Sequence, residues 1–209
     1  MFVSRRLVVS LVVLAWGLPL ASAPASAATL LVNGSGILTG ATGVDVGGTP
    51  YDVEFVEGAC YVLFHGCNSA GDFTFTTQAG AASAGQALLD QVFLDNAVLG
   101  AFDSNPALTF GCGSSLHCFI DTPYALIGSG VWINSTRNSV ADAGPTGDAP
   151  DFVTPYSVTT NTADSNVDVY ARWTPSDVAA PVPEPASLTL LGLGLAGMGA
   201  RRWRQRRTS

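Results

Sequence analysis

The sequence predicts a mainly β domain of the α+β class, an antiparallel sheet or sandwich with one packed amphipathic helix. Apolar and polar residues alternate with a period of two over several short segments, which is typical of half-buried strands. One longer segment instead repeats its apolar residues with helical spacing. Segments of different composition flank this domain, so we place the boundaries at 1–27, 28–178 and 179–209 of the 209 residues.

The strands are predicted where the alternation is most regular. Val44–Val46 and Tyr51–Phe55 flank Gly47 and Gly48, which can adopt the positive φ of a tight turn, so these two strands should form an antiparallel hairpin. The other predicted strands are 73–75, 108–111, 131–134, 156–160 and 167–173.

The helix is predicted over Ala84–Asp95. Ser83 and Gln86 have the spacing of a capping box, and Leu88 and Val92 contribute to a broad apolar face. This face should pack against the sheet.

The charge of the central domain excludes one class of partner. Between Ala28 and Ala180 there are fifteen Asp and Glu residues and only two basic residues, Arg137 and Arg172, a net charge of about −13. Such a surface repels phosphate backbones and has no cationic cluster to release counterions. We therefore expect no binding to nucleic acid.

The N-terminal segment has the order of a secretory signal peptide. Arg5 and Arg6 precede an apolar run over 7–18, and small residues follow in the pattern that signal peptidase cuts. Cleavage after Ala23 would leave proline first, so we predict cleavage between Ala27 and Ala28. The chain is then exported.

The C-terminal segment combines three features in order. Prolines at 181, 183 and 185 keep the chain extended and accessible. The apolar segment 188–198 is long enough for a short or tilted transmembrane helix. Five arginines then hold the end on the cytoplasmic side, at Arg201, Arg202, Arg204, Arg206 and Arg207.

These residues resemble a known sorting signal. Val182-Pro183-Glu184-Pro185, the apolar segment and the terminal arginines are similar to the PEP-CTERM sorting domain. The resemblance implies recognition of Pro183, Glu184 and Pro185 by an exosortase, a membrane transpeptidase of Gram-negative bacteria that make extracellular polysaccharide. It also implies a transient anchor in the inner membrane, followed by delivery to the cell surface or extracellular matrix.

Four cysteines in an exported domain indicate disulfides. The short separations favour Cys60–Cys67 and Cys112–Cys118, although spacing alone leaves three pairings open. His65 and His117 lie beside these pairs, so a zinc site is the alternative. An oxidising compartment favours the disulfides, and we predict no metal or other cofactor.

No group of residues points to catalysis. Ser114, Ser115 and His117 are close in sequence, but a glycine-rich loop between cysteines is more typical of a hydrogen-bonded turn. Glu54 and Glu57 could form a glycosidase pair, yet fifteen acids make some proximity expected by chance. We predict that the chain is not an enzyme.

One segment begins like a calcium-binding loop, with Asp164, Asn166 and Asp168 at alternate positions. Val169 and Pro175 stand where that loop requires glycine and glutamate. The segment is better interpreted as a strand that follows a polar turn.

The leading hypothesis is a structural or adhesive surface or matrix component without catalysis. The alternative is a glycan-binding module, with extracellular polysaccharide as its partner and aromatic rings that stack on sugars. A secreted hydrolase is the third hypothesis. The candidate stacking residues are Tyr61, Tyr124, Trp132, Tyr156 and Trp173.

Overall fold

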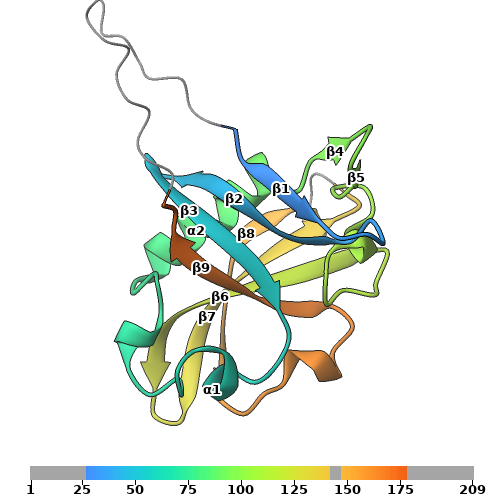
Figure 1. The fold of residues 1–209 in the computed structure, drawn as a ribbon. Helices are drawn as coiled ribbons and strands as arrows, with labels where there is room; N and C mark the ends of the chain where they lie inside the picture. The colour runs from blue at the N-terminus through green and yellow to red at the C-terminus, as the bar shows by residue number, and fades with distance from the viewer. Residues whose placement is uncertain (1–26, 142–146, 178–209) are drawn as a thin grey trace, which may run out of the picture. The chain divides into compact units, whose positions relative to one another are not determined.

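The computed structural model describes residues 27–141 and 147–177, and most of their regular structure is β-strand (Figure 1). The strands are β1 Thr29–Val32, β2 Leu38–Val46, β3 Thr49–Val56, β4 Asp95–Asn96, β5 Gly100–Ala101, β6 His117–Ile127, β7 Gly130–Ser139, β8 Ala149–Ser157 and β9 Asp168–Pro175. The helices are α1 Cys60–Leu63 and α2 Gln78–Gln91, with 3-10 turns η1 Ala70–Asp72, η2 Pro106–Leu108 and η3 Thr162–Asp164.

Seven strands form one sheet in the order β1-β2-β3-β9-β6-β7-β8, and β4 and β5 pair separately. Neighbouring strands of the large sheet are antiparallel except β6 and β9, which are parallel. The sheet is therefore mixed. The predicted hairpin is confirmed, because β2 pairs with β3 through a turn in which Gly47 and Gly48 have φ of 62° and 88°.

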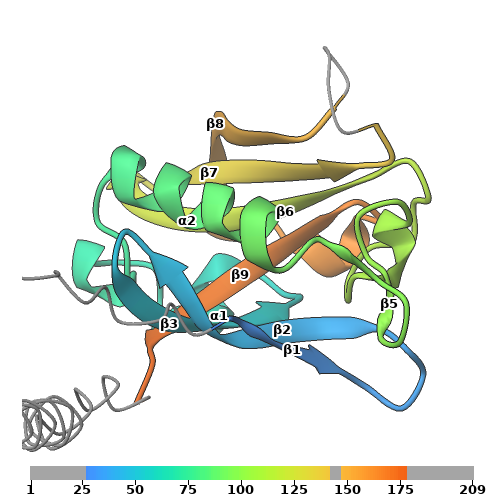
Figure 2. The same ribbon diagram turned by 90° about the horizontal axis from the view of Figure 1, so that it is seen from above.

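The sheet curls around α2. Register shifts interrupt β1, β2, β6 and β7, and such bulges bend a sheet and increase its twist. Figure 2 shows α2 along the β6–β7–β8 half of the sheet, with the β1–β2–β3 half on its other side. Consistent with this view, α2 contacts β2 as well as β6, β7 and β8.

The packed helix is present, but both predicted ends are wrong, since it spans Gln78–Gln91 and not Ala84–Asp95. It begins after Thr77, whose side chain accepts a hydrogen bond from the amide of Gly80, and not after Ser83. Its buried stripe consists of small residues such as Ala81 and Ala84, together with Leu88. Gly85 lies so close to β7 that an added Cβ would be 2.1 Å from Oγ1 of Thr136.

Three predicted strands need correction. Residues 73–75 form no strand; Phe73 packs into one hydrophobic cluster and Phe75 into the other, so their alternation reflects two cores. Residues 108–111 contribute only an isolated bridge between Thr109 and Leu38. The strand predicted at 156–160 is displaced, since β8 ends at Ser157.

Both faces of the β6–β7 pair are covered. Helix α2 lies on the face of Thr136, whereas the segment around α1 packs on the face of Ile133 and Tyr170. The rings of Phe64 and Tyr170 meet edge to face, with centroids 5.4 Å apart. This second, smaller core includes Cys60 and Cys67.

The two membrane-related predictions lie outside the described residues. These are the signal peptide, 1–27 apart from its last residue, and the C-terminal apolar segment, 188–198. Among the helices of residues 27–141 and 147–177, none has the length and hydrophobicity needed to cross a membrane.

Candidate functional site

Both predicted disulfides are formed. The Cα atoms of Cys60 and Cys67 are 5.8 Å apart, and those of Cys112 and Cys118 are 5.7 Å apart. The two bridges belong to different hydrophobic clusters, so they do not combine into one metal site. Nowhere in the described part of the chain do three His, Cys, Asp or Glu side chains come together as metal ligands.

The loop with the candidate nucleophile is a hydrogen-bonded turn. The hydroxyl of Ser114 accepts a hydrogen bond from the amide of Leu116, 3.2 Å away. The ring of His117 packs against Phe119, with centroids 5.1 Å apart. These contacts give the two residues structural roles.

The three residues that resembled a calcium loop have different surroundings. Asp164 is exposed in η3, and the carbonyl of Asn166 accepts hydrogen bonds from the amides of Gly113 and Ser114. Asp168 accepts a hydrogen bond of 2.6 Å from the hydroxyl of Ser165. The segment is therefore a turn leading into β9, as expected.

Most of the candidate stacking aromatics belong to the interior. Tyr124 and Trp173 are buried, and Trp132 and Tyr156 pack against the two hydrophobic clusters. Tyr61, in contrast, exposes 51% of its surface. Of the five rings, Tyr61 is thus the one placed to meet a ligand.

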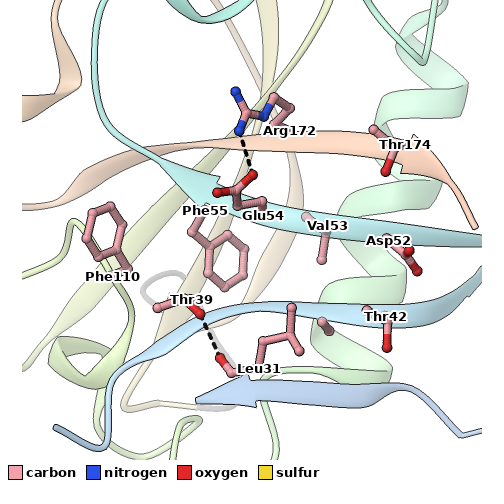
Figure 3. Close-up of a pocket in the computed structure, with 11 residues that line it drawn as sticks. Leu31, Thr39, Thr42, Asp52, Val53, Glu54, Phe55, Phe110, Arg172 and Thr174 are labelled. Atoms are coloured by element: carbon pink, nitrogen blue, oxygen red, sulfur yellow. Dashed lines mark hydrogen bonds and ion pairs between the residues drawn. The ribbon is translucent and has the colours of Figure 1, made fainter. Parts of the chain in front are cut away.

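An open hollow of about 440 Å³ lies on the outer surface of the β1–β2–β3–β9 half of the sheet. Figure 3 shows the side chains that line it, with hydroxyls contributed by Thr39, Thr42 and Thr174. Leu31 and Phe110 add partly exposed apolar surface. Their combination of hydroxyls and apolar groups could contact the polar and apolar faces of a sugar ring.

The charged groups of the hollow come from adjacent strands. In β3, Glu54 forms an ion pair of 2.5 Å with Arg172 of β9 (Figure 3). Both side chains are substantially exposed, so the pair contributes roughly 1 kcal/mol at most and can exchange partners at low cost. Asp52 is fixed differently, because its carboxylate accepts hydrogen bonds from the Gly43 amide and the Ser176 hydroxyl.

A buried acid lies on the face of the sheet that α1 covers. Asp121 stands opposite Ser135 on one side and Tyr170 on the other. The Ser135 hydroxyl donates to one carboxylate oxygen at 2.6 Å, while the other oxygen has no hydrogen bond within the usual distance to any described residue. Burial, assisted by the negative charge of Asp168, raises the pKa of Asp121 well above its usual value.

Two tyrosines belong to the same cluster. Burial also raises the pKa of Tyr156 and of Tyr170 above the usual range of tyrosine. Asp121 and Tyr170 are both 0% exposed. Two carboxylates thus lie in one cluster, but Asp121 cannot be reached from solvent. Asp121 was not predicted as a site residue, although an acid directly after Phe119 and Ile120 is an unusual pattern.

The predicted sorting residues, Pro183–Pro185 and the five C-terminal arginines, lie outside the described residues, as does the segment before Ala27 at the predicted cleavage site. They are covered by comparison with known families. Residues 181–207 match the family model of the PEP-CTERM protein-sorting motif. No curated protein matches the chain, and no solved structure matches it. The chain therefore carries a PEP-CTERM protein-sorting motif at residues 181–207, which supports an exported protein processed by exosortase.

Proposed function

We propose that the central domain is a non-catalytic passenger, delivered to the surface or extracellular matrix of a Gram-negative bacterium as a structural or adhesive component. In this proposal signal peptidase cuts between Ala27 and Ala28, and exosortase acts at Pro183-Glu184-Pro185. The sorting motif at 181–207 is the observation that carries it.

The chemistry of the passenger supports this assignment. Two buried disulfides suit an oxidising compartment, and each closes a short loop. Ser114 is engaged in a turn, Glu54 in an exposed ion pair and Asp121 in a buried cluster. The turn, the ion pair and the buried cluster are contacts that a structural protein needs, and none of them requires a catalysed reaction.

The sorting step is tested by replacing Pro183, Glu184 and Pro185 with alanine in the native host. The matched control is Pro181→Ala, which removes a proline from the same segment but leaves the triplet intact. We expect the control to be processed and retained at the envelope like the natural protein, and the triple variant to remain unprocessed. Intact-mass analysis of the purified envelope protein reads both ends. Identical masses and location for the triple variant would contradict the proposal.

A second candidate function is glycan binding at the hollow of Figure 3. Three threonine hydroxyls, an exchangeable ion pair and a partly exposed phenylalanine ring favour it. The test is a glycan array probed with the mature protein and with Thr174→Val, which removes one hydroxyl while preserving the shape of the strand. Binding that Thr174→Val weakens would support this function, and an array without binders would contradict it.

A further inference from the structure

Two further hollows adjoin the hollow of Figure 3. A smaller one, of about 200 Å³, shares the lining residues Arg172 and Thr174 with it. Another, of about 410 Å³, shares Phe110 with it. Hollows that share lining side chains lie next to one another, so we call the three together the outer track. An arrangement of this kind suits an extended molecule better than a single sugar ring.

The hollow of Figure 3 is itself long. Its lining residues come from β1, β2, β3 and β9, which are four consecutive strands of the sheet. Neighbouring strands are separated by about 4.8 Å, so three such steps span roughly 14 Å. A linear polymer can therefore lie across this hollow with more than one of its units in contact.

Every part of the outer track carries a carboxylate. The acidic lining residues are Asp52 and Glu54 in the hollow of Figure 3, Asp72 in the smaller hollow and Glu57 in the larger one. Among the described lining residues, the basic side chains are Arg172 and His65. The acids outnumber these two groups, so the outer track stays negative even when both are charged.

The charge of the whole domain acts in the same direction. A net charge of about −13 attracts cations and repels anions within the range that salt allows. An anionic polysaccharide is therefore repelled, and a neutral one gains nothing from this field. A polymer with repeated positive charges is attracted by the domain and meets a carboxylate in each hollow.

Glu54 is the carboxylate best placed to receive a positive group of a ligand. Its side chain is 58% exposed, and its partner Arg172 is 41% exposed, so their ion pair is in contact with water. Asp52, in contrast, already accepts hydrogen bonds from within the domain. Thr174 stands opposite Asp52 and next to the ion pair, because β3 and β9 are paired there. A sugar whose amine reaches Glu54 thus has a hydroxyl partner close by.

We propose that the outer track binds a linear polysaccharide of amino sugars whose amines are free and protonated. The proposal rests on glycan binding at the hollow of Figure 3 and specifies the class of sugar. One ammonium group replaces Arg172 at Glu54, while hydroxyls of the same sugar bond with Thr174. Further ammonium groups of the polymer meet Asp72 and Glu57. Because the contacts repeat along the polymer, longer chains bind more tightly.

Titration calorimetry of the mature protein with soluble oligomers tests this proposal. Oligomers of glucosamine, of N-acetylglucosamine and of a uronic acid are compared at equal length, at a mildly acidic pH where the amines carry protons. We expect the glucosamine oligomers to bind most tightly and their affinity to rise with length. We also expect this affinity to fall as salt is added, because salt screens the attraction.

Two substitutions at one ion pair separate the charge argument from a loss of structure. Glu54→Gln should weaken binding of the glucosamine oligomer by about threefold or more, whereas Arg172→Gln should strengthen it by a similar factor, because it removes the competing cation. Both variants break the same ion pair, so a purely structural effect would shift affinity in the same direction in both. Asp90→Asn is the matched control, since it removes one exposed carboxylate from α2, inside the curl of the sheet (Figure 2). We expect it to bind nearly like the natural protein.

Several results would overturn the proposal. Glucosamine oligomers that bind no more tightly than N-acetylated ones would do so, as would weaker binding by Arg172→Gln; glycan binding itself then stands wherever Thr174→Val weakens it. If no oligomer binds, glycan binding fails as well. Oligolysine serves as a polycation without sugar rings, and equal binding of both polycations without any effect of Thr174→Val would also overturn the proposal. Sorting is measured separately, by envelope retention.

Discussion

Replacing Gly85 with alanine tests how closely α2 packs on β7. In an exposed helix this change would stabilise the protein by about 1 kcal/mol. Here the new Cβ would lie 2.1 Å from Oγ1 of Thr136 and 2.9 Å from the carbonyl oxygen of Pro150. Overpacking of this kind typically costs about 1–3 kcal/mol, so we expect the free energy of unfolding to fall by about 1–2 kcal/mol.

Urea unfolding of the mature protein with its disulfides intact measures this change. Gly80→Ala is the matched control in the same helix, because its Cβ would meet only side-chain atoms, at 3.2 Å and beyond. We expect its stability to stay within about 0.5 kcal/mol of the natural protein. Adding Thr136→Ala to Gly85→Ala removes the closest atom and should restore part of the loss.

The result that would refute this reasoning is a Gly85→Ala protein at least as stable as Gly80→Ala. It would mean that α2 stands further from β7 than the structure shows, or that the helix moves away at negligible cost. The m-value is the slope of the free energy of unfolding against urea concentration. A change in this slope without a change in the urea midpoint would indicate an altered denatured state and would not count as support.

Three further predictions concern stability. Replacing Cys60 and Cys67 with serine should lower the free energy of unfolding by about 2.5 kcal/mol for a loop of this length, as measured in urea. Neutral Asp121 stabilises the fold fully below the usual aspartate pKa, so the free energy of unfolding should decline as pH rises from that value to the raised pKa of Asp121. Asp121→Asn should make the free energy of unfolding, measured in urea, less dependent on pH over this range. Thr77→Ala should cost about 1 kcal/mol in thermal or urea unfolding, whereas Ser83→Ala should have little effect, contrary to the capping box predicted from sequence.

Local sequence patterns predict those elements whose interaction partners lie close by in the sequence. The hairpin of β2 and β3 follows from two alternating segments and a pair of glycines, all within twenty residues. Alternation also predicts β9, and β7 extends beyond the strand predicted at 131–134. The disulfide pairing also follows from short separations.

The longest strand, β6, was missed for a physical reason. It contains Pro123, which has no amide hydrogen, and the buried polar residues Asp121 and Thr122. A central strand normally avoids both features. The sheet accommodates them because the register shifts after Pro123 and because β9 pairs with β6 only from Phe119 to Asp121.

The candidate sites depend on the fold in different degrees. The sorting residues are contiguous, so their pattern is visible in the sequence. The hollow combines Thr39, Glu54 and Arg172 from three strands, whose proximity no sequence pattern indicates. Four of the five aromatic rings suggested for glycans lie in or against the cores, and burial cannot be read from residue type alone.

The sequence by itself determined that this is a mainly β, acidic, disulfide-containing domain followed by a sorting motif, because composition, period and contiguous motifs are local properties. Only the tertiary structure decided that seven of the strands form one mixed sheet, that α2 begins six residues earlier than Ala84, and that Asp121 is buried. Those outcomes depend on contacts between residues far apart in the chain, whose free energies override local preference.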